Sequence, residues 1–133
     1  GSENINKLHD DDIRSLLNYA ENENVASEIA KLIATHKKEF NSENVSILLY
    51  RSKNKEEMAR ILGSENLNKL DHHEFYEILH WAKNKDEMAK VIITYKKKLY
   101  DTDVKALIHY ATNKDEIRQM LKDRGINTNY EDI

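Results

Sequence analysis

Hydrophobic positions recur at the spacing of one helix face in four successive segments of the chain. In each segment they occupy positions i, i+3, i+4 and i+7, which lie on one side of an α-helix. The pattern therefore predicts four amphipathic helices of about ten residues each, at regular intervals. The four sets are Ile13, Leu16, Leu17 and Ala20; Val45, Leu48, Leu49 and Ser52; Phe75, Ile78, Leu79 and Ala82; and Val104, Leu107, Ile108 and Ala111.

A second helix is predicted after each of these, because the intervening turn carries a helix-start signal. Three turns share the motif Asn-Lys-Asp/Glu-Glu, which begins at Asn54, Asn84 and Asn113. Asn at an N-cap accepts a hydrogen bond from the first turn, and Glu three residues later can reach back to the cap, so we interpret the motif as a capping box. The predicted second helices are Ser27–Lys38, Lys55–Leu62, Asp86–Tyr95 and Asp115–Arg124, with Gly125 as the stop after the last.

The first helices also have polar residues suited to the N-cap position, where a side-chain oxygen accepts a backbone N–H. Glu74 follows one of them at the spacing of a capping box. Two irregularities interrupt the pattern: about three extra residues at 21–24, and an early end to the second repeat at 63–66. The predicted N-caps are Asp10, Ser42, Asp71 and Asp101.

The second half of the chain resembles the first. With an offset of 59 positions, Ser27–Leu62 aligns with Asp86–Leu121 without a gap, and thirteen aligned pairs are identical. A period of about 30 residues lies within this offset, since the Asn-Lys motif recurs at that interval. We therefore predict an all-α fold of four helix-turn-helix repeats, starting near residues 8, 40, 70 and 99, that form a short α-solenoid or a compact helical bundle.

These repeats are predicted to form a single domain over residues 8–125, with halves 8–62 and 67–125. Gly1-Ser2 is typical of the remnant of a cleaved expression tag, so residues 1–7 are interpreted as a tag scar and lead-in. Residues 126–133 are polar and without helical patterning, and we expect this tail to be frayed rather than packed.

Composition narrows the fold and the function classes. The 133 residues include no Cys, no Pro and three Gly. The absence of Cys excludes a disulfide framework and a thiolate metal site. The scarcity of Gly disfavours a Gly-rich phosphate-binding loop. With a formal net charge of -3, no global field draws the chain to DNA or to an anionic membrane. No apolar run is long enough for a membrane span or a secretory signal, so a cytoplasmic or other reducing intracellular compartment is expected.

Candidate catalytic and metal-binding residues are few. Nucleophilic catalysis needs a base and an oxyanion donor beside the nucleophile, but the predicted loops are short and the serines serve as caps or helix-facing residues. His73, Glu77 and His80 share the spacing of one helical face, yet structural zinc sites use four ligands from separate elements. We therefore expect no enzyme activity, no cofactor and no metal.

A column of large side chains at the edge of the first helices is the most informative feature. Aromatic residues and Arg are enriched at binding hot spots, because they bury much area and keep a polar tip. Equivalent positions of stacked repeats line up along one surface, so we predict a partner-binding surface there. Its candidate residues are Tyr19, Tyr50, Arg51, Tyr76, His80, Trp81, His109 and Tyr110.

Recurring lysine clusters offer an alternative. Helix C-termini favour cations, which accounts for the clusters without a ligand, but the same side chains could contact phosphates. The openings of the repeats, such as Ile13 with Leu16-Leu17, loosely resemble the first helix of transcription-activator-like DNA-binding repeats, although the Gly-rich loop of that family is replaced here by residues 82–85 and 111–114 without glycine. The alternative nucleic-acid-binding residues are Lys37, Lys38, Lys96, Lys97 and Lys98.

The sequence thus predicts a non-catalytic helical repeat module that binds another protein, as an adaptor, a docking domain or a stoichiometric regulator or inhibitor. Nucleic-acid binding and self-association through the ends of the repeat array, as a homo-oligomer, are the alternatives. The abundance of Asn, Lys and Ile is typical of AT-rich genomes, so a bacterial origin and delivery into a host cell as an effector are kept as hypotheses.

Overall fold

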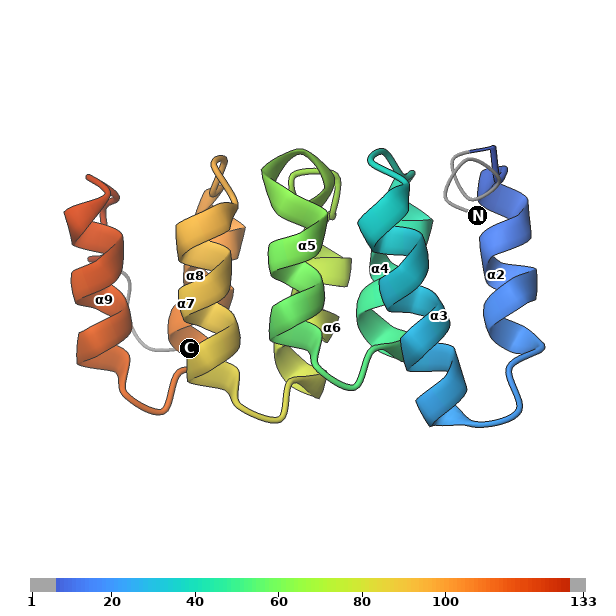
Figure 1. Cartoon of the computed structure of the whole chain (residues 1–133). Coiled ribbons are helices and arrows are strands. Elements are labelled where there is room, and N and C mark those ends of the chain that lie inside the picture. The colour runs from blue at the N-terminus through green and yellow to red at the C-terminus, as the bar shows by residue number, and fades with distance from the viewer. Residues whose placement is uncertain (1–6, 130–133) are drawn as a thin grey trace.

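The computed structural model describes residues 7–129, and in this range all regular secondary structure is α-helical. Figure 1 shows the helices side by side in a row that follows the order of the chain, with α2 at one end and α9 at the other. The helices of this range are α2 Asp10–Asn18, α3 Glu23–His36, α4 Ser42–Arg51, α5 Lys55–Leu67, α6 His72–Trp81, α7 Lys85–Tyr95, α8 Asp101–Tyr110 and α9 Lys114–Asp123.

The helices form two layers. Helices α2, α4, α6 and α8 pack in sequence in one layer, and α3, α5, α7 and α9 do so in the other. The apolar faces of both layers meet in one continuous core, which includes Ile13, Leu49, Leu79 and Ile108 from the first layer. The predicted all-α fold is confirmed, and the helix contacts are those of a compact bundle or a short solenoid. The internal duplication stays a prediction.

The starts of the first-layer helices agree with the sequence at one position and differ by one residue at the others. Asp71 caps α6 as predicted: its carboxylate accepts from the Glu74 N–H at 2.7 Å, and Glu74 accepts from the Asp71 N–H at 3.0 Å. Elsewhere the predicted cap is the first helical residue, and the two that are acidic, Asp10 and Asp101, interact favourably there with the helix dipole. The observed caps are His9, Asn41 and Tyr100, each one residue before Asp10, Ser42 and Asp101.

The shared Asn-Lys motif holds both helices of a pair at the turn. Asn84 caps α7 by accepting from the Glu87 N–H at 3.0 Å, as predicted. The next residue, Lys85, donates from Nζ to the carbonyls of His80 and Ala82, at 2.7 and 3.1 Å, and so closes the end of α6. Helices α4 and α8 end in the same way, on the ammonium groups of Lys55 and Lys114.

The glutamates of this motif do not reach back to the cap, contrary to the prediction. Each one pairs with a cation on the preceding helix of the second layer, at N–O distances of 2.5 to 3.0 Å. We call these contacts the ion-pair ladder, because they join α3 to α5, α5 to α7 and α7 to α9. The pairs are Lys31–Glu57, Arg60–Glu87 and Lys90–Glu116.

Two glycines with positive φ shape the helix ends. Gly63, with φ of 74°, kinks α5 at the predicted stop, but the helix resumes and runs to Leu67. Gly125, with φ of 78°, ends α9 as predicted, and the next residue packs on the core. Ile126 packs on the core and Thr128 is buried, whereas Asn127 and Asn129 are exposed, so two residues of the predicted tail are packed rather than frayed. Residues 1–6 of the predicted tag scar and lead-in at 1–7, and residues 130–133 of the predicted tail, lie outside the described residues.

Candidate protein-interaction surface

Aromatic side chains from α6 and α8 gather on the outer face of the first layer. Tyr110 stands at the centre, with ring centroids 5.5 Å from Tyr76, 5.9 Å from His80 and 4.8 Å from His109. Trp81 joins through His80 at 5.3 Å. The i, i+4 spacing of Tyr76 and His80 places both on one face of α6, and α8 packs beside it. We call these five residues the aromatic cluster.

The cluster is only partly shielded from solvent. The side chain of Trp81 is 58% exposed, and His80 is exposed as well. Tyr110 lies deeper, with its hydroxyl 3.5 Å from Nδ1 of His80. Burial raises the pKa of Tyr110, and the neighbouring Tyr76 raises it further. The cluster is thus a rigid base of packed rings with Trp81 standing free at its edge.

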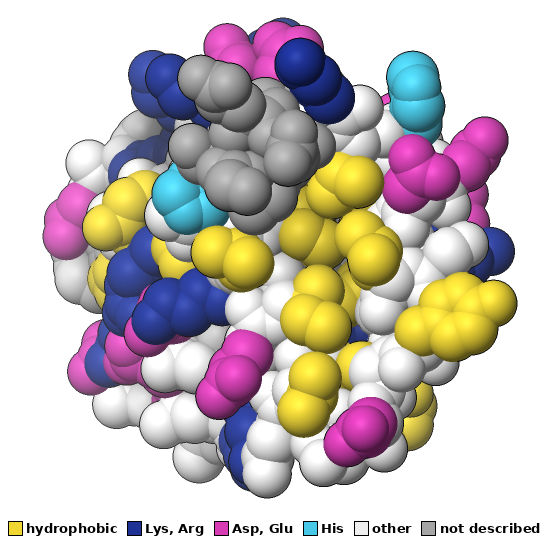
Figure 2. Space-filling view, turned by 45° about the vertical axis from the view of Figure 1, so that its right-hand side comes forward, with side chains coloured by type: hydrophobic (Ala, Val, Ile, Leu, Met, Phe, Trp, Pro, Cys, Tyr) yellow, Lys and Arg dark blue, Asp and Glu magenta, His cyan; other side chains and the backbone are white. Residues whose placement is uncertain are grey.

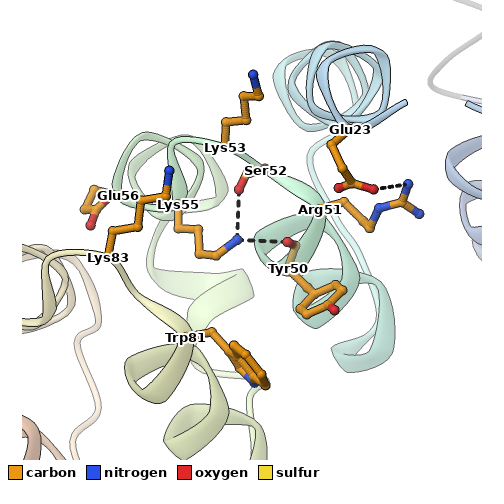
Figure 3. Close-up of a pocket in the computed structure, with 9 residues that line it drawn as sticks. All are labelled: Glu23, Tyr50, Arg51, Ser52, Lys53, Lys55, Glu56, Trp81 and Lys83. Atoms are coloured by element: carbon orange, nitrogen blue, oxygen red, sulfur yellow. Dashed lines mark hydrogen bonds and ion pairs between the residues drawn. The ribbon is translucent and has the colours of Figure 1, made fainter. Parts of the chain in front are cut away.

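A first hollow of about 370 Å³ opens on one side of Trp81. Figure 3 shows the rings of Tyr50 and Trp81 pointing the same way from α4 and α6, with Lys53 and Lys83 rising from the turns above them. Lys55 lies between, where its ammonium donates to the Tyr50 and Ser52 carbonyls; burial lowers its pKa. The residues lining the first hollow are Glu23, Tyr50, Arg51, Ser52, Lys53, Lys55, Glu56, Trp81 and Lys83.

A second, more open hollow of about 410 Å³ lies on the other side of Trp81. Four members of the aromatic cluster, all except His109, line it, together with two histidines from the first turn of α6. Trp81 therefore separates two adjoining concave regions on one face. The lining residues are His72, His73, Tyr76, Glu77, His80, Trp81 and Tyr110.

The structure brings together seven of the eight residues that the sequence singled out. Tyr50 and Trp81 are exposed beside the first hollow, while Arg51 is turned inward and pairs with Glu23 at 3.3 Å. Tyr19, at the C-cap of α2, is 87% exposed and lines neither hollow. The remaining four are Tyr76, His80, His109 and Tyr110 of the aromatic cluster.

Sequence reasoning missed the lysines at the rim of the first hollow. Lys53 and Lys83 each come two residues after a member of the predicted column, Arg51 and Trp81. Both are exposed, in turns that follow neighbouring helices of one layer. Their equal offset from the column was the signal that could have identified them.

The two lysine clusters do not form the continuous cationic surface that binding to a nucleic acid would require. Lys96 is 1% exposed, and its ammonium pairs with Asp103 at 3.3 Å and also donates to the Lys98 carbonyl. It is therefore not available to a polyanion. Lys97 and Lys98 are exposed, as is Lys38 in the other cluster.

Two of the three candidate metal ligands, His73 and Glu77, contact each other. His73 Nε2 lies 3.2 Å from a Glu77 carboxylate oxygen. Among residues 7–129, no group of three His, Asp or Glu side chains is arranged to hold a metal ion. Across the same residues, no helix has the length and apolar character needed to cross a bilayer.

Comparisons of this chain with protein-family models, with curated proteins and with solved structures find no match. The resemblance of the first helices to transcription-activator-like repeats stays one of helical patterning.

Proposed function

We propose that the chain is a non-catalytic helical module that binds a partner protein through the face formed by Tyr50, the aromatic cluster and the two hollows. The observation that carries the proposal is the position of Trp81, which stands exposed between two concave regions and is supported from behind by packed rings. An adaptor, a docking domain or a stoichiometric regulator of an enzyme would each use such a face.

The physical case rests on residue type and rigidity. Trp and Tyr contribute large contact areas and lose few rotamers on binding, so they dominate the energy of many interfaces. Here both side chains project from helices of one packed layer, so little backbone rearrangement is needed when a partner binds. The hollows on either side of Trp81 offer places for side chains of the partner.

Charge at the first hollow indicates the chemistry of the partner segment. Lys53 and Lys83 are exposed at its rim, whereas the cations of Lys55 and Arg51 are already engaged with carbonyls and with Glu23. A partner segment that inserts an apolar side chain between Tyr50 and Trp81 and carries Asp or Glu beside it satisfies both parts of this surface.

Affinity capture from a lysate with the parent chain and a Trp81→Ala, Tyr110→Ala variant tests the proposal. Recovery of one protein by the parent, lost with the variant, is expected; mass spectrometry identifies it and nuclease treatment leaves it unchanged. Recovery of nuclease-sensitive material alone would favour the nucleic-acid alternative and contradict the proposal.

With the captured partner purified, Trp81→Ala is expected to weaken binding by more than about 2 kcal/mol, because it removes the exposed anchor. Tyr95→Ala is the matched control, since Tyr95 is a partly exposed aromatic residue of α7 in the other layer and lines neither hollow. Isothermal titration calorimetry measures both, with circular dichroism to check helicity. A Trp81→Ala chain that loses its helicity would show that Trp81 is a packing residue and overturn the assignment.

A further inference from the structure

The outer side of α2 and α3 carries apolar side chains that are exposed at this end of the row of helices. Leu16 on α2 is 41% exposed and Leu32 on α3 is 50% exposed. Ile29, on the same side of α3, is partly buried. We call these three residues the end face. Figure 2, in which the α2 side of the molecule is turned forward, shows hydrophobic side chains gathered in a strip there.

Residues aligned with Leu16 and Ile29 are buried in the other helix pairs, whereas those aligned with Leu32 range from the buried Val91 to the partly buried Ile61 and Met120. The counterparts of Leu16 are 0 to 7% exposed, and those of Ile29 are 0 to 2% exposed. The end face therefore has the composition of an interface between helix pairs, and within residues 7–129 no helix packs on it. The counterparts of Leu16 are Leu48, Ile78 and Leu107, and those of Ile29 are Met58, Met88 and Ile117.

The ion-pair ladder adds a charge to this face. Glu28 aligns with the ladder glutamates Glu57, Glu87 and Glu116, each of which pairs with a Lys or Arg of the preceding helix. Glu28 itself is exposed, and no cation of the described residues pairs with it. The Glu28 carboxylate is thus placed to pair with a Lys or Arg on a further second-layer helix, if such a helix packed against α3.

We propose that the end face binds one more helical hairpin of the same pattern, presented by a partner protein, whose second helix places a Lys or Arg against Glu28. Apolar side chains of the hairpin would cover Leu16, Ile29 and Leu32 in the way that α2 and α3 cover their counterparts on α4 and α5. This surface lies apart from the hollows beside Trp81 and is independent of the function proposed for them.

A second copy of the chain stacked head to tail does not meet these requirements. The residue of α9 that aligns with Lys31, Arg60 and Lys90 is Gln119, which carries no charge and donates to Asp123 at 2.9 Å. The far end of the row therefore offers Glu28 no cation at the ladder position.

A tethered hairpin tests the proposal on the full chain. Residues Leu70–Lys98, which contain α6, α7 and the ladder cation Lys90, are copied and joined through a flexible Gly/Ser linker to the N-terminus. Docking is expected to slow hydrogen exchange of the α3 amides at least tenfold relative to the parent chain. Leu32→Asp should return the exchange to the parent rate, whereas Tyr95→Asn in the parent part, away from the end face, should leave the slowing intact.

The charge swap tests the placement of the hairpin. Glu28→Lys should reduce the slowing a few-fold, in line with the strength of exposed ion pairs, and Lys90→Glu in the copied hairpin should restore it. Glu28→Lys and Lys90→Glu change exposed side chains, so they still test the proposal if the Leu32→Asp chain does not fold. The proposal would be overturned if the α3 amides of the fusion exchanged at the same rate as in the parent chain. It would also be overturned if their exchange were slowed but neither Leu32→Asp nor the charge swap changed that slowing. A parent dimer that Leu32→Asp dissociates, measured by sedimentation, would assign the face to a second copy instead.

Discussion

Lys96 illustrates how the environment of one residue decides its role. The run of three lysines at 96–98 looks uniform in the sequence, but the first is buried and the other two are exposed. The difference arises because Asp103, seven residues later, is held inside by its own bond to the Tyr100 N–H at 3.0 Å. No periodic pattern encodes this contact, so the sequence did not predict it.

Removal of one partner from this buried ion pair is expected to be costly. Lys96→Met leaves the Asp103 carboxylate buried without its cation, and we expect the free energy of unfolding to fall by about 3 kcal/mol. Lys97→Met, at an exposed neighbour, should change it by less than about 0.5 kcal/mol. Urea denaturation followed by circular dichroism measures both, and equal effects of the two substitutions would argue against a buried pair.

Tyr110 gives the aromatic cluster a signature in its pH dependence. The pKa of Tyr110 is raised in the folded chain, first by burial and then by Tyr76, so the fold retains this proton after the unfolded chain has lost it. Its contribution to stability is therefore present below about pH 10, the ordinary Tyr value, and is lost as pH rises above it. As pH rises above about 10, the urea concentration at the midpoint of unfolding should fall less in Tyr110→Phe than in the parent chain. Tyr19→Phe, at an exposed position, is the control.

At the scale of the helices, the sequence predicted what local periodicity and capping chemistry encode. The Asn N-caps and the stop at Gly125 were correct because their partners lie within one helical turn. The roles of Lys85 and Glu87 were not foreseen, since Lys85 contacts the preceding helix and Glu87 contacts a helix of the preceding pair. The start of α3 was placed four residues late, because the helix begins at Glu23 within the extra residues at 21–24 and is capped by Asn22.

The Asn-Lys turn allows these two roles to be separated. Asn84→Ala removes an N-cap and should lower the free energy of unfolding by about 1 kcal/mol. Lys85→Met leaves the α6 carbonyls of His80 and Ala82 without their charged hydrogen-bond donor. This substitution should lower the free energy of unfolding by a similar further amount, about 1 kcal/mol. Denaturation midpoints check both. A double variant no less stable than Asn84→Ala alone would show that the lysine does not stabilise the turn.

At the scale of the whole molecule, the fold class could be predicted because helix periodicity, caps and the scarcity of Gly and Pro all agree. The site could be predicted in part, since aligned residues of successive pairs come to lie on one face. Tyr19 lies outside this face, and Arg51 lines the first hollow with its guanidinium already paired with Glu23. Equivalent positions share a place in the row of helices but differ in the side chains that they contact.

The layered packing has a kinetic consequence. Among residues 7–129, each helix contacts only helices that are one or two places away in the chain, so the pairing of distant segments is not required there. Chains with such local contacts close short loops first and fold in about microseconds to milliseconds, and here there is no proline whose isomerisation would delay them. A newly synthesised chain can therefore pack each hairpin onto the preceding one as it emerges, before the rest of the chain is made.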